Sequence, residues 1–100
     1  MATFKRFEDI EAWQRAREIS RQLYALTNNG AFARDFGLRD QVRRASVSVM
    51  ANIAEGFGRG GNREFSQFLA HSRGSLAELK SHLYVALDAG FMDETAFREL

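Results

Sequence analysis

The chain has 100 residues and a net charge of +1, and 45% of its residues are hydrophobic while 27% are charged. This balance is ordinary for a folded protein and excludes a disordered chain, so we expect residues 1–100 to form one domain with a modest core. The absence of cysteine excludes a disulfide framework and a thiolate metal site, and the absence of proline suits uninterrupted helices. The near-neutral charge is not typical of a strong nucleic-acid binder, although local arginine patches could still form.

Two further classes of protein do not fit the sequence. No apolar run approaches the roughly 20 residues that a membrane span needs. The first residues, Met1 to Arg6, lack the apolar centre of a signal peptide. We therefore expect a cytoplasmic protein that has no membrane partner.

The first predicted helix covers about residues 9–28, where apolar residues recur with helical spacing from Ile10 onward. Asp9 or an adjacent residue begins this helix, and the polar stretch that ends in Gly30 stops it. Residues 31–37 are the least regular part of the chain. We expect a loop or one short turn there, with Phe32 and Phe36 folded onto the bundle.

The second predicted helix, about residues 38–57, carries two apolar stripes. The first stripe consists of Leu38, Val42, Ala45, Val49 and Ile53, and the second of Val47, Met50, Ala54 and Phe57. A helix that is apolar nearly all round is buried nearly all round. Because a chain this short cannot enclose such a helix completely, we expect a second copy of the chain to cover part of it.

The third predicted helix, about residues 63–89, has a heptad stripe that is typical of a left-handed bundle. The short joint before it predicts an antiparallel hairpin, with Gly56 and Gly58 as left-handed residues and Asn62 as the cap of the third helix. Gly90 ends that helix, and Asp93 begins a fourth one. The sequence thus predicts an all-α fold, an up-down antiparallel four-helix bundle whose fourth helix is short or truncated.

Motifs for catalysis or cofactor binding are weak. Glu78 and His82 lie four residues apart and could share a metal, but the paired Glu-x-x-His motifs of a di-iron bundle do not occur. The stretch from Gly58 to Gly61 lacks the Gly-Lys-Ser/Thr of a phosphate loop, so a turn between helices is the better interpretation. We expect no enzymatic activity, no catalytic residue, no cofactor and no metal.

Asn52 and Glu55 are the most informative polar residues, because both lie in the least polar helix. Buried, they would need hydrogen-bond partners, and Glu55 would need a cation such as Arg59 or Arg63. We favour a structural network that locks the helical hairpin over a binding site. The predicted network comprises Asn52, Glu55, Arg59, Arg73 and Glu78.

A basic patch at the start of the second helix is the one candidate contact for nucleic acid. It consists of Arg39, Arg43 and Arg44. These side chains either form a solvated face paired with Asp40 or contact phosphates.

Several motifs together resemble the ribosomal-RNA intervening-sequence proteins, also called four-helix bundle proteins. The similarity covers about residues 4–92. The motifs are Phe7-Glu-Asp-Ile-x-x-Trp13-x-x-Ala16, Asp40 to Ala45, Asn52 to Arg59, Glu64-Phe65 and Arg73-Gly-Ser-x-x-Glu78-Leu79. The chain departs from the family in the stretch from Gly30 to Asp35, which lacks proline, and in its shorter fourth helix.

The resemblance implies an up-down four-helix bundle that assembles as a ring-like homopentamer without enzymatic activity. Some members of the family are encoded inside insertions in large-subunit ribosomal-RNA genes. A similar protein accompanies diversity-generating retroelements, where it binds a reverse transcriptase and nucleic acid through a basic surface. The expected partners are therefore further copies of this chain and, as alternatives, nucleic acid or a reverse transcriptase.

Overall fold

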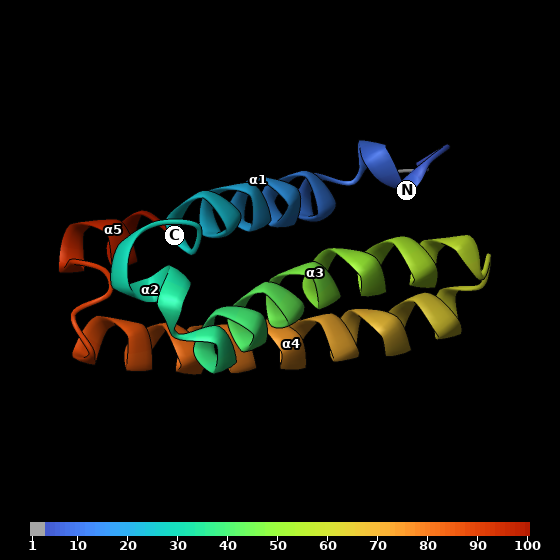
Figure 1. Ribbon diagram of the computed structural model, residues 1–100. Coiled ribbons are helices and arrows are strands. Elements are labelled where there is room, and N and C mark those ends of the chain that lie inside the picture. The colour runs from blue at the N-terminus through green and yellow to red at the C-terminus, as the bar shows by residue number, and fades with distance from the viewer. Residues whose placement is uncertain (1–3) are drawn as a thin grey trace.

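The computed structural model describes residues 4–100, and the regular elements in that range are all helical (Figure 1). This confirms the all-α fold that the sequence predicts. The elements are a 3-10 turn η1 (Phe7–Asp9) and the helices α1 (Glu11–Leu26), α2 (Gly30–Arg34), α3 (Phe36–Gly58), α4 (Asn62–Asp88) and α5 (Glu94–Glu99).

Three long helices follow one another in alternating directions, and α3 is the central one. It packs along α4 and also against α1. The short helices α2 and α5 lie at one end of the bundle, whereas the N-terminal segment lies toward the end where α3 turns into α4 (Figure 1). The bundle is elongated, with principal extents of 44 × 19 × 18 Å.

The best-packed part of the core lies at the end of the bundle that carries α2 and α5. Leu23 of α1, Val42 of α3 and Leu79 of α4 meet there and are almost fully buried. Phe32 of α2 is only 1% exposed, and its ring stacks on Phe91 with 5.3 Å between the centroids. The burial of these apolar side chains is the main favourable term that holds the short segments to the long helices.

Only one of the two phenylalanines in the 31–37 region folds onto the bundle. The prediction was right for Phe32 and wrong for Phe36, whose side chain is 64% exposed. Asp35 caps α3 by accepting a hydrogen bond from the Leu38 amide at 3.0 Å, so the helix begins at Phe36 itself. The side chain of this first helical residue therefore points away from the core, and the guanidinium of Arg39 lies over its ring at 4.8 Å.

The joint between α3 and α4 differs from the prediction. Gly56 and Gly58 both lie inside α3, and the left-handed residue is Gly60, with φ of 84°. The helix α4 begins after Gly61 without a side-chain cap, so the predicted capping role of Asn62 is also wrong. Gly56 instead permits close packing, because a Cβ atom there would lie 2.6 Å from the Cβ atom of Phe68.

The end of α4 follows the sequence signals closely. Gly90 has φ of 79°, and the Phe91 amide donates to the Ala86 carbonyl at 2.9 Å, which is the bonding pattern of a glycine-ended helix. Asp93 then caps α5 by accepting a hydrogen bond from the Ala96 amide at 2.7 Å. With six residues, α5 is the short fourth helix that the sequence predicts.

Candidate functional site

A line of small polar side chains joins α3 to α4. The hydroxyl groups of Ser48 and Ser75 lie 2.8 Å apart, and the buried Ser72 hydroxyl donates to the Val49 carbonyl at 2.8 Å. Asn52 extends the line, because its amide nitrogen donates to the carbonyl and to the hydroxyl of Ser48 at 2.8 and 3.1 Å. Small side chains let the helix backbones approach, and these hydrogen bonds fix which residues lie opposite one another.

Glu55 does not join this buried line. The Asn52 side chain is half-buried, whereas that of Glu55 is 54% exposed and pairs with Arg59 at 2.8 Å. The prediction that Glu55 is largely buried is therefore wrong in the folded chain. The physical reason is that the next residue, Gly56, is the one that faces α4, and adjacent helical residues point about 100° apart. Arg59 in turn lies over the Phe68 ring at 5.2 Å, so the pair rests on the surface of α4.

The other two members of the predicted network lie elsewhere. Glu78 contacts His82, with 3.3 Å between Oε1 and Nε2, and Arg73 lines a groove that faces α1. Five residues of α-helix rotate a side chain by roughly 140°, so Arg73 and Glu78 leave α4 on different sides. The five predicted residues thus form three separate groups in the folded chain. Within residues 4–100, no cluster of three His, Asp or Glu side chains is placed to hold a metal ion.

The predicted basic patch is largely engaged in contacts within the chain. Arg39 stacks on Phe36 and pairs with Asp40 at 3.1 Å. Arg43 lies over the Tyr24 ring at 4.6 Å, and its Nε donates to the Thr27 hydroxyl at 2.8 Å. Of the three predicted arginines, only Arg44 is fully exposed.

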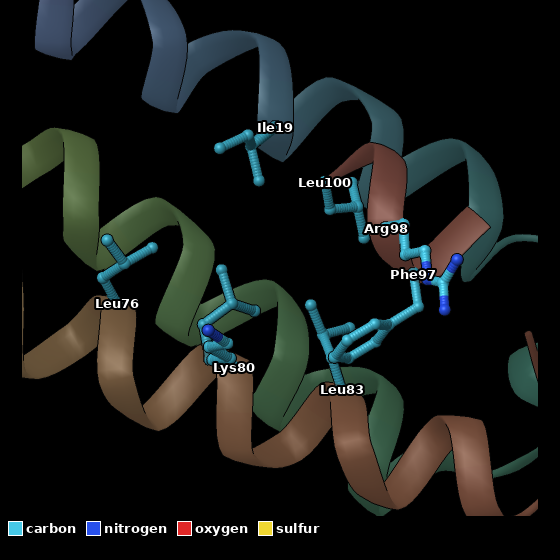
Figure 2. Close-up of a pocket in the computed structure, with 8 residues that line it drawn as sticks. Ile19, Leu76, Lys80, Leu83, Phe97, Arg98 and Leu100 are labelled. Carbon is cyan, nitrogen blue, oxygen red and sulfur yellow. The ribbon is translucent and has the colours of Figure 1, made fainter. Parts of the chain in front are cut away.

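A groove runs between α1 and α4, on the side of the bundle where α5 lies. We call it the α1–α4 groove. It consists of two adjoining cavities of about 350 and 380 Å³ that share Ile19 of α1 and Leu76 of α4. Figure 2 shows Ile19 reaching from α1 toward Leu76 and Leu83 of α4, with Phe97 and Leu100 of α5 closing one end.

Sequence reasoning missed this groove, although part of the signal is present. Leu69 and Leu76 belong to the heptad stripe of α4, and both line the groove. A stripe residue needs a facing helix, and α5 is too short to face the whole of α4. The size of the uncovered part depends on how far apart α1 and α4 lie, which no local pattern encodes.

No helix within residues 4–100 combines the length and the apolar character needed to cross a lipid bilayer.

The antiparallel α3–α4 hairpin, the docked α1 and the short fourth helix place the molecule among the small all-α helical-bundle proteins. The chain belongs to the family described as 23S rRNA-intervening sequence protein, which matches residues 8–100. The match spans both specific motifs, Asn52 to Arg59 and Arg73 to Glu78, and confirms the resemblance read from the sequence. Among curated proteins, none matches the chain.

Proposed function

We propose that the protein is a non-enzymatic, cytoplasmic assembly protein whose helical bundle associates into a homo-oligomer. The observation that carries this proposal is the second apolar stripe of α3. Val47 is 41% exposed, and Met50, Ala54 and Phe57 are only half-buried by the chain itself. The expected subunit number, five, comes from the resemblance to the ring-forming members of the family.

The exposed part of this stripe is extended enough to serve as an interface. Phe36, Val47 and Ala54 are spaced by 11 and 7 residues, so all three lie near one face of α3. They span about 27 Å along the helix axis at roughly 1.5 Å per residue. An uninterrupted apolar surface of this kind on a small protein is typical of an interaction site. If it packs against a different surface of the next copy, repetition closes a ring.

Sedimentation equilibrium at micromolar concentration tests this proposal. We expect a mass several times the 11.3 kDa of one chain, and a shift to monomer for Val47→Glu, because a buried charge at the interface is costly. Val85→Glu is the matched control, since Val85 is 52% exposed on α4 and lies outside the stripe. A monomeric native protein contradicts the proposal, and equal dissociation by both variants contradicts the assignment of the interface to α3.

A second candidate function is that of an accessory factor for nucleic acid, with a reverse transcriptase as the possible protein partner. Two observations favour it: the family description refers to ribosomal RNA, and Arg44 is exposed beside Arg43 on α3. Assembly would repeat this arginine around the oligomer and strengthen the local positive field.

A gel-shift assay with RNA and DNA at low and high salt tests the nucleic-acid function. Affinity should fall steeply as salt rises, because phosphate contacts release counterions. Arg44→Ala should flatten that salt dependence, whereas Arg63→Ala at the start of α4 serves as a charge-matched control. The absence of any shift at low salt would remove this candidate.

A further inference from the structure

The α1–α4 groove has the shape of an unfilled helix position. α5 lies along it, and Phe97 and Leu100 close one end. Beyond them the groove continues between α1 and α4 as far as Leu69. The open part from Leu69 to Leu79 measures about 15 Å, or nearly three helical turns.

The floor of the groove is apolar and is built to accept a helix. Ala12 and Ala16 present small side chains from α1, while Leu69 and Leu76 present large ones from α4. Leu76 is 46% exposed, although it belongs to the stripe that bundle helices normally bury. Small residues facing large ones offer the ridges and grooves that a further helix needs.

The charged side chains along the groove all have one sign. Arg15 and Arg73 line one cavity, and Lys80 and Arg98 line the other. In the described range 4–100, neither cavity has an aspartate or a glutamate in its lining. In a chain whose net charge is only +1, this segregation gives the groove a positive rim on both the α1 and the α4 side.

From these features we propose that the α1–α4 groove binds an amphipathic helix of a partner protein that carries acidic residues on both sides of its apolar stripe. The apolar stripe fills the space above Ile19 and Leu76, and the acidic flanks lie against Arg15 on one side and Arg73 and Lys80 on the other. An apolar floor does not suit phosphate groups, because protein–nucleic acid interfaces are more polar than protein–protein interfaces. The inference does not depend on the proposed self-assembly, since it concerns a different face of the molecule.

The probe is a synthetic peptide of about 14 residues, which forms about four helical turns. It carries leucines at the spacing i, i+3, i+4, i+7, glutamates on both flanks and a fluorophore at one end. A matched peptide has lysine in place of every glutamate. Fluorescence anisotropy at low salt should show the acidic peptide binding more tightly than the basic one by at least about tenfold, because like charges across an interface are strongly unfavourable.

Two protein variants locate the binding. Leu76→Asp should abolish binding of the acidic peptide, and the double variant Arg73→Glu with Lys80→Glu should reverse the preference toward the basic peptide. All three positions are exposed, so the variants should keep the circular dichroism spectrum and melting temperature of the native protein. Val85→Asp, on another face of α4, should leave binding unchanged.

The outcomes distinguish the possible occupants. Equal binding of both peptides, or binding that survives Leu76→Asp, overturns the proposal. If Leu76→Asp lowers the oligomer mass in sedimentation equilibrium, then a second copy of this chain fills the groove and the partner-helix proposal is wrong. Reversal of peptide preference with an unchanged oligomeric state supports the proposal, whatever the result of the Val47→Glu experiment.

Discussion

Gly56 lies where α3 and α4 come closest. A methyl group there would lie 2.6 Å from the Cβ atom of Phe68 and 3.2 Å from a ring carbon of Phe65. The Phe68 Cβ atom is fixed by its own backbone, so one of the two helices has to shift. We expect Gly56→Ala to lower the free energy of unfolding by about 1–3 kcal/mol, the range typical of overpacked cores, as measured by urea denaturation.

Gly74→Ala is the control for this prediction. Gly74 also lies inside a long helix, but no atom lies within 4 Å of a Cβ atom built there. The substitution should raise the free energy of unfolding by roughly 0.5–1 kcal/mol, because alanine favours a helix interior over glycine. If both variants proved more stable than the native protein, the close approach at Gly56 would not be a real constraint.

Asn52 and Glu55 are expected to differ in their contribution to stability. Asn52→Ala removes two hydrogen bonds to Ser48 at a half-buried position and should cost about 1 kcal/mol. Glu55→Ala removes a pair whose side chains are 54% and 56% exposed and should cost no more than about 0.5 kcal/mol. Thermal melts of both variants at low protein concentration test the difference. A larger loss for Glu55→Ala would mean that Glu55 is buried in the assembled protein.

The sequence predicted some single residues well and others poorly, and the reason is geometric. Gly90 and Asp93 act through hydrogen bonds within a few residues of themselves, so a local pattern is enough to find them. Glu55 and Gly56 are adjacent, and a rotation of about 100° decides which one faces α4. Periodicity in a helix with two apolar stripes does not resolve that choice, and a glycine can end a helix as well as bring two helices together.

Among the helices, α5 depends most on its ends. Its six residues are too few to be stable alone, because isolated helices shorter than about 12 residues are marginal in water. The Asp93 cap and the contact of Phe97 with Tyr84, whose ring centroids lie 4.7 Å apart, hold it in place.

Removing the cap should therefore release α5. Asp93→Ala is expected to cost about 1 kcal/mol and to speed amide hydrogen exchange in residues 94–99 without changing exchange in α3. Asp93→Asn is the control, because asparagine is an equally good cap. Unchanged exchange in α5 after Asp93→Ala would show that side-chain packing alone holds this helix.

At the scale of the whole molecule, the α3 stripe and the α1–α4 groove are apolar surfaces that the single chain leaves open. Helix boundaries could be predicted because each follows from residues close in sequence. The open surfaces could be predicted only in part: the surplus stripe of α3 is visible in the sequence, whereas the groove arises from the distance between α1 and α4.

Self-association should make thermal stability depend on protein concentration. If copies cover the α3 stripe, mass action raises the melting temperature as concentration increases, because the assembled state contains only folded chains. Val47→Glu should remove most of this dependence, and calorimetry over a wide concentration range measures it. A melting temperature that does not change with concentration in the native protein would indicate that the chain unfolds as a monomer.

The tight α3–α4 hairpin also has a kinetic consequence. Only three residues separate α3 from α4, so closing this loop costs little chain entropy, and contacts near in sequence tend to form early. Helix α1 has to dock onto α3, and α5 has to close over the pair afterwards. In stopped-flow experiments, Gly56→Ala should mainly slow folding, whereas Asp93→Ala should mainly speed unfolding. The hairpin would then be the nucleus of folding, and the helices beside the groove would be the last to form.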